Sequence, residues 1–195
     1  MPGSIKIDDG SGNYTILTNA GSLGSDKTLT IPNETATLAT TNGITQADLW
    51  RLTANITGTD ATISSNLERV DEQTNVYIGG GMSVSSGIWT FPTTGIWRVT
   101  CKATLQVQNG DSNAFVLAYK TTNNSSYDQF FNCVAGNQGS STVNYSSSMS
   151  GFLDVTDTTQ VKVRFDTFSM SASTILVGNT NNNNTIFEFI RLGDT

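Results

Sequence analysis

The sequence predicts an all-β protein, a β-sandwich or jelly roll that follows a short β-rich N-terminal arm. Several segments alternate apolar and polar residues with a period of two, and polar, turn-rich stretches separate them. Of the 195 residues, 36% are apolar and only 13% are charged, while Ser, Thr, Asn and Gly make up most of the remainder. This composition suits strands and turns, and no segment sustains the 3.6-residue period of a packed helix.

Residues 1–46 form the predicted arm, which contains short strands on either side of a turn near Asp9 and Gly10. Such strands are too poor in apolar residues to bury a core, and isolated hairpins are marginally stable. We therefore expect the arm to be stable only against other copies of itself or a docking partner. The residues expected to make these contacts are Ile5, Ile7, Tyr14, Ile16, Leu17, Leu29, Ile31 and Leu38.

The predicted head covers residues 47–195. At its start, Trp50 and Leu52 indicate a first strand, and residues 67–72 suggest a short helical turn. Residues 97–107 alternate over eleven positions, which predicts a strand with one buried and one polar face.

The remaining strands of the head are predicted from shorter segments. Residues 114–119 are apolar throughout, as in a strand buried on both faces. Residues 161–165 alternate again, and residues 185–192 place Phe187 and Phe189 on one side of a closing strand. No repeat of fixed period is visible, which argues against a solenoid or propeller.

The charge pattern disfavours several classes of function. The net charge is −6: residues 1–75 carry four bases and nine acids, and residues 76–195 carry six bases and seven acids. An acidic chain without a basic stripe is a poor partner for nucleic acid. The N-terminus lacks the features of a secretory signal, and no apolar run is long enough for a membrane helix.

The residue types also argue against catalysis and metal binding. The chain has no His, which is the commonest general base and metal ligand. Cys101 and Cys133 are too few for a Cys-only zinc site, and we expect buried, reduced thiols, although a disulfide between them stays open. We therefore predict no catalytic residues, no cofactor and no bound metal.

Three acidic or glycine-rich motifs have simpler explanations than a ligand site. Residues 79–81, three glycines, lack the Gly-Lys-Ser/Thr of a phosphate loop and are interpreted as a strand connection. Asp154 and Asp157 could bind Ca²⁺, but turn residues are expected. Asp8 and Asp9 could pair as carboxylates, but no cleft is evident around them, so a solvated turn is expected.

Aromatic and amide side chains raise the question of recognition. Trp89 and Trp97 could stack on sugars, but their alternating faces predict core positions. The uncharged polar loops contain a mixture of residue types similar to that of antibody paratopes. The simpler interpretation is that these loops are solvated. The candidate receptor-contact residues are Tyr127, Asn137, Gln138, Tyr145, Asn181 and Asn182.

Residues 87–103, GIWTFPTTGIWRVTCKA, resemble the strand–turn–strand of the complement first-component q-subunit globular head and the tumour necrosis factor superfamily. The match rests on an aromatic before Phe-x-Pro-x-x-Gly and the aliphatic-aromatic pair that follows. Residues 151–165 and 185–193 resemble late strands of the same family. The resemblance implies a trimeric jelly roll over residues 47–195.

Two further segments resemble proteins of tailed phages. Residues 50–58, WRLTANITG, with the segments that follow, are similar to versions of the head carried by virion proteins, and residues 28–41 resemble segments of phage fibres. We therefore predict a non-enzymatic virion protein, assembled in the host cytoplasm: a trimeric tail fibre or adhesin. Residues 1–46 would dock to a tail, baseplate or capsid protein, and the head would contact a host surface glycan or protein. A capsid decoration protein is the alternative, and a glycan-degrading phage enzyme is a weaker one.

Overall fold

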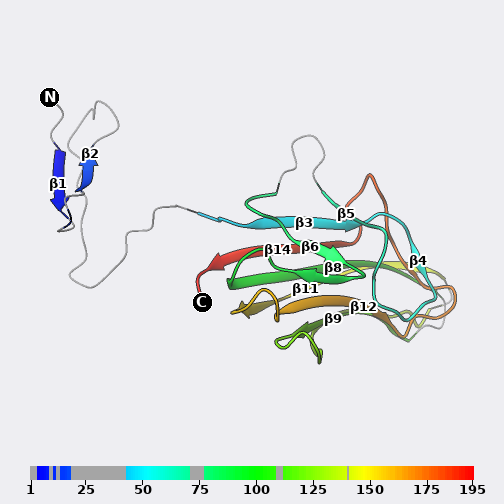
Figure 1. Cartoon of the computed structure of the whole chain (residues 1–195). Coiled ribbons are helices and arrows are strands. Elements are labelled where there is room, and N and C mark those ends of the chain that lie inside the picture. The colour runs from blue at the N-terminus through cyan, green and yellow to red at the C-terminus, as the bar shows by residue number, and fades with distance from the viewer. Residues whose placement is uncertain are drawn as a thin grey trace, which may run out of the picture. The chain divides into compact units, whose positions relative to one another are not determined.

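The computed structural model divides the chain into two compact units, residues 1–40 and residues 41–195, each of which is considered by itself. Figure 1 shows the strands of both units. The structure describes residues 4–8, 11, 14–18, 43–70, 77–108, 112–139 and 141–195.

The N-terminal unit contains an antiparallel hairpin of β1 (Ser4–Asp8) and β2 (Tyr14–Thr18). Ile5 pairs with Leu17, and Ile7 pairs with Thr15. Both strands were predicted from the sequence, and both are confirmed. Asp9 and the predicted arm residues Leu29, Ile31 and Leu38 lie outside the described residues.

The head is a sandwich of two antiparallel sheets, and its described residues include no helix, so the predicted all-β jelly roll is confirmed. The five-stranded sheet has the order β10-β9-β12-β7-β6. These strands are β10 (Asp128–Ala135), β9 (Ala114–Thr121), β12 (Lys162–Phe168), β7 (Ile88–Thr90) and β6 (Ser83–Ser85).

The seven-stranded sheet has the order β4-β13-β8-β14-β3-β5, and β11 pairs along the free side of β8. Because β11 has no second neighbour among the described strands of this sheet, it is an edge strand. The strands are β4 (Ile56–Thr57), β13 (Ile175–Leu176), β8 (Gly95–Val107), β14 (Ile186–Gly193), β3 (Ala47–Leu52), β5 (Leu67–Arg69) and β11 (Val143–Val155).

Aromatic side chains fill the space between the two sheets. Trp89 lies 5.0 Å from the ring of Trp50 and 5.0 Å from the ring of Phe189, and Phe165 lies 4.5 Å from Phe187. Trp97 is buried, and its indole N–H donates to the carbonyl of Thr93 at 3.1 Å. The predicted core positions of Trp89 and Trp97 are therefore confirmed.

The two cysteines are buried and unpaired in the core. They come from opposite sheets, β8 and β10, and the Cys133 thiol donates to the backbone carbonyl of Cys101 at 3.3 Å. The neighbouring Cys133 thiol, together with burial, raises the pKa of the Cys101 thiol well above its ordinary value. The predicted reduced thiols are confirmed.

Two predictions for the head need correction. The helical turn at residues 67–72 is wrong over its described part, because Leu67–Arg69 form β5 and pair with Trp50–Leu52. The apolar segment 114–119 is β9, but its two faces are not equally buried. Leu117 is covered, whereas Phe115 and Tyr119 on the same outward face are half-buried, because among the described residues of the head no further layer lies over this sheet.

Candidate functional site

The free edge of the sandwich at β11 leaves apolar side chains uncovered. Tyr145 pairs with Leu105, and Met149 pairs with Cys101, so both side chains face the same side of the sheet as the buried core. Nevertheless Tyr145 is 39% exposed and Met149 is 47% exposed. An edge strand whose inward-facing side chains are exposed offers a surface for another chain.

One end of this edge is closed by Phe130. The register between β9 and β10 shifts between Gln129 and Phe131, which is the signature of a β-bulge. The Phe130 ring then packs on Gly151 of β11, where an added Cβ would lie 2.5 Å from the ring. The bulge and the glycine together seal the sandwich at this point, and the uncovered inward-facing residues of β11 precede Gly151 in the strand.

The outward face of the seven-stranded sheet carries a second set of apolar side chains. They surround an ion pair of Arg98 and Glu188, whose nitrogen–oxygen distance is 2.9 Å. Phe152, which pairs with Arg98 across the strands, is 68% exposed. We call this surface the sheet face; its residues are Leu49, Ile96, Arg98, Phe152, Ile186, Glu188 and Ile190.

A small hollow of about 110 Å³ lies on the sheet face, between β3, β14 and the segment around Ile78. The residues that line it are Ala47, Asp48, Leu49, Ile78, Glu188 and Ile190. Ile78 is brought there by two backbone hydrogen bonds with Ala47, of 3.0 and 2.8 Å. The hollow gives the sheet face a place where a single side chain of another molecule could insert.

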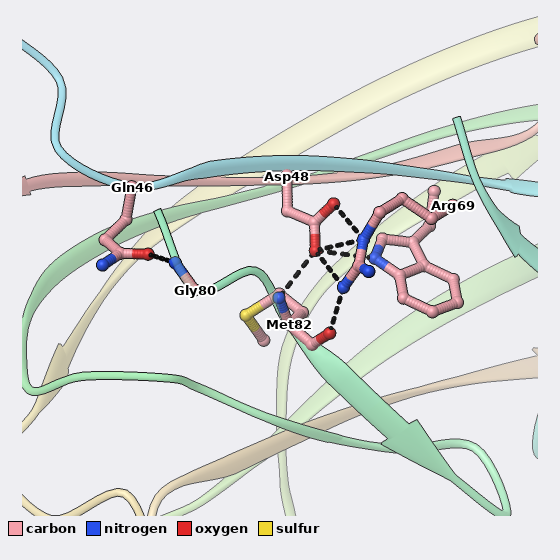
Figure 2. Close-up of polar contacts among 6 residues, drawn as sticks. Gln46, Asp48, Arg69, Gly80 and Met82 are labelled. Atoms are coloured by element: carbon pink, nitrogen blue, oxygen red, sulfur yellow. Dashed lines mark hydrogen bonds and ion pairs between the residues drawn. The ribbon is translucent and has the colours of Figure 1, made fainter. Parts of the chain in front are cut away.

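A buried carboxylate fixes the loop beside this hollow (Figure 2). Asp48 accepts hydrogen bonds from the Trp50 indole at 2.9 Å, the Arg69 guanidinium at 3.0 Å and the Met82 backbone N–H at 2.6 Å. The Arg69 guanidinium also donates to the Met82 carbonyl at 2.6 Å and stacks on the rings of Trp50 and Tyr77. The network ties β3, β5 and the start of the β6 segment together.

The three glycines predicted to be a strand connection lie next to this network. Gly79 and Gly81 have φ values of +77° and +68°, which L side chains rarely adopt. Gly80 donates its backbone N–H to the Gln46 side chain at 2.8 Å (Figure 2). The glycines therefore serve the chain's own geometry, and the interpretation as a strand connection is confirmed.

The predicted receptor-contact residues do not gather in one place. Tyr127 precedes β10, whereas Asn137 and Gln138 follow it, so they lie at opposite ends of the strand. Tyr145 belongs to β11 and not to a loop, which corrects the prediction. Asn181 and Asn182 are exposed in the connection from β13 to β14.

Asn137 and Tyr127 are both engaged within the chain. Asn137 is only 3% exposed: its amide donates to the carbonyls of Val107 and Ser141 and accepts from Gly139. It holds its own loop, so the expectation of a surface contact is wrong for this residue. The Tyr127 ring lies 4.6 Å from the Arg164 guanidinium, and desolvation raises the pKa of Tyr127 while Arg164 opposes the shift.

The acidic turn between β11 and β12 is explained by hydrogen bonding. Asp157 accepts bonds from the Thr159 hydroxyl and backbone N–H, both at 2.7 Å. These bonds lower the pKa of Asp157 below its ordinary value. Within the described ranges, no group of three or more acidic, Cys or His side chains could hold a metal ion, and no helix could cross a membrane.

Sequence reasoning did not single out Met149 and Phe152, whose side chains are 47% and 68% exposed. The stretch from Val143 to Ser150 contains four serines, so it does not alternate in the way that a half-buried strand does. The segment between the predicted strands at residues 114–119 and 161–165 is long enough to contain a further strand. This length was the signal available in the sequence.

Comparison with known proteins supports the fold. No family model matches the chain, and no curated protein matches it. Among solved structures, murine APRIL at pH 5.0 is similar with a TM-score of 0.56 and 12% identity, and the match covers 75% of this chain and 99% of APRIL. Eiger TNF from S. frugiperda gives 0.56 and 11%, with 76% and 93% covered. The globular domain of the zebrafish complement 1qA protein gives 0.53 and 10%, with 77% and 99% covered.

These similarities extend the sequence resemblance to the whole sandwich. The head has the jelly-roll fold of the tumour necrosis factor and complement q-subunit globular domains. At identities of 10–12%, the likeness concerns the fold.

Proposed function

We propose that this chain is a non-enzymatic structural protein whose heads associate as a homotrimer and whose residues 1–46 attach it to a bacteriophage particle. The observation that carries the proposal is the uncovered edge of β11, where Tyr145 and Met149 face inward yet remain exposed. A chain that keeps such an edge open would bury it on assembly.

The sheet face is the natural counterpart of this edge. It is apolar around one ion pair, and it lies on the same chain but on a different surface. Contacts between two different surfaces are heterologous, and they close into a ring when the rotation allows it. The family resemblance implies that the ring has three members.

The non-enzymatic part of the proposal rests on the residues available. The chain has no His, and the exposed hollow on the sheet face contains acidic residues only as the ion-paired Asp48 and Glu188. Paired carboxylates free to act as acid and base, which a glycan-degrading enzyme needs, are not among its lining residues. A structural role accounts for the described surfaces without additional chemistry.

The particle assignment is supported by resemblance of the sequence. Residues 28–41 resemble segments of phage fibres, and residues 50–58 with the following segments resemble virion heads. We favour a tail fibre or adhesin over a capsid decoration protein, because the arm is fibre-like.

Association is tested by sedimentation of the full chain at micromolar concentration. We expect a trimer for the wild type. Met149→Asp and Phe152→Asp should give monomers, because each places a charge in an apolar contact. Ser85→Asp, an exposed position on the edge strand β6, is the matched control and should remain trimeric. A monomeric wild type would refute the proposal, as would both Asp variants remaining trimeric.

The role of the arm is tested by comparing residues 47–195 with the full chain. We expect the shorter protein to fold, because the head's strands begin at Ala47, and to lose incorporation into the particle. The arm carries Asp8, Asp9, Asp26 and Glu34, so docking to a basic patch should weaken with salt. Equal loading of the two proteins onto particles that lack the wild-type chain would show that the head is the docking module.

A further inference from the structure

The outward face of the five-stranded sheet contains a hollow of about 160 Å³ that the proposed trimer contact does not use. It spans β10, β9 and β12, and it lies on the opposite sheet from the sheet face. The residues that line it are Phe115, Leu117, Gln129, Asn132 and Phe168.

Two aromatic rings and one aliphatic side chain form the apolar part of this hollow. Phe115 and Phe168 pair across β9 and β12, with ring centroids 6.1 Å apart and planes inclined by 49°. Phe168 nevertheless remains 51% exposed. Leu117, two residues after Phe115 on the same face of β9, is buried.

The other side of the hollow carries two amides. Gln129 and Asn132 stand on β10, and Asn132 pairs directly with Leu117. Within the described part of the chain, neither amide side chain makes a hydrogen bond with protein. Each amide offers one acceptor oxygen and two N–H donors, so the hollow has hydrogen-bonding capacity next to exposed ring surface.

The charges beside the hollow are already compensated. Arg164 and Asp166 form an ion pair of 3.2 Å, and the guanidinium lies 4.9 Å from the ring of Tyr119 and 4.6 Å from that of Tyr127. None of the described residues that line the hollow is charged. An occupant that carried a charge would therefore find no partner in the hollow.

We propose that this hollow binds one ring of a neutral sugar. The apolar face of a pyranose would lie on Phe168 and Phe115, and its hydroxyls would bond to the amides of Gln129 and Asn132. The hollow of about 160 Å³ has room for one small ring or one side chain. Its mixture of amides and rings fits a polyhydroxylated ligand better than a purely apolar side chain.

The site is complete on a single chain, so it does not depend on the proposed trimer. The test uses the full chain and the methyl glycosides of glucose, galactose and N-acetylglucosamine as probes. NMR follows the methyl signals of Leu117 and of Val134, which pairs with Phe115 across β10 and β9. We expect at least one glycoside to shift both signals with a dissociation constant in the millimolar range, as expected for a shallow site.

Two variants decide the assignment. Phe168→Ala and Gln129→Ala should each weaken binding about tenfold, which corresponds to the loss of one ring contact or one hydrogen-bonding group. Leu192→Ala removes a side chain of matching exposure, 52%, from the other sheet and should bind as the wild type does. Thermal midpoints identify any variant that fails to fold. If Phe168→Ala fails to fold, Gln129→Ala still tests the proposal, because Gln129 is exposed.

Three results would overturn the proposal. The first is that none of the probes binds, or that the shifts map outside the hollow. The second is that all three variants bind equally. The third is that Phe168→Ala changes the sedimentation of the protein without affecting any probe, which would make the hollow a contact between copies of the chain.

Discussion

β8 and β11 are neighbouring strands of equal length, thirteen residues each, paired one to one along their entire span. Along β8, buried and half-buried residues alternate without a break, whereas most of β11 is exposed on both faces. Only its last residues, such as Leu153 and Val155, are buried. Hydrogen bonding alone therefore does not bury a strand; a second sheet must also lie over it.

The difference follows from where each strand lies. β8 is flanked by β14 and β11 and is covered by the five-stranded sheet, so its inward side chains meet protein on every side. β11 lies at the sheet edge, where the cover ends with Phe130 on Gly151. The same backbone geometry thus produces a core in one strand and a candidate contact surface in the next.

The largest expected effect on stability comes from a substitution in β8. Trp97→Ala should lower the free energy of unfolding by roughly 3–5 kcal/mol, because it empties a large buried site beside Phe91. Chemical denaturation of wild type and variant at one protein concentration measures the change. An unchanged midpoint would place Trp97 outside the core.

A matched pair across the two strands sharpens the comparison. Leu105 and Tyr145 are directly paired, but Leu105 is fully buried and Tyr145 is not. Leu105→Ala should cost about 2–5 kcal/mol at any protein concentration. Tyr145→Ala should cost little in dilute protein and more as concentration rises, because its effect acts through association. Thermal melts over a concentration series check both, and a Tyr145 effect independent of concentration would contradict the assignment of β11 as a contact edge.

The smallest expected effect concerns the point where the edge is sealed. Gly151→Ala should cost about 1 kcal/mol, because the added Cβ would meet the Phe130 ring, which must shift. Combining it with Phe130→Leu should recover part of the loss, since the pair is in contact. Four unfolding curves complete this double-mutant cycle, and simple additivity would mean that the ring does not pack on Gly151.

Local pattern was sufficient for much of the fold. The period of two at residues 97–107 predicted β8, and the residues it assigned to the inner face are buried. Phe187 and Phe189 were likewise placed correctly in the closing strand. In a strand that is covered on one side, every second residue must be apolar, so the sequence itself shows which face is buried.

The candidate sites were predicted less well, for a related reason. Tyr145 was expected in a loop and lies in β11, and Asn137 was expected on the surface and is buried. A strand exposed on both faces has no need to alternate, so its sequence resembles a loop. The residue type alone does not distinguish an Asn whose amide bonds to carbonyls of its own loop from an Asn that faces solvent.

By itself, the sequence determined the fold class, the aromatic core and the position of the long central strand, because hydrophobic periodicity is a local property. Only the tertiary structure decided which surfaces remained uncovered. The ion pair of Asp48 with Arg69 joins residues 21 positions apart, and the hollow bounded by Phe115, Asn132 and Phe168 joins three strands. Such sites depend on strand order and register, which bring distant residues together and which no local pattern encodes.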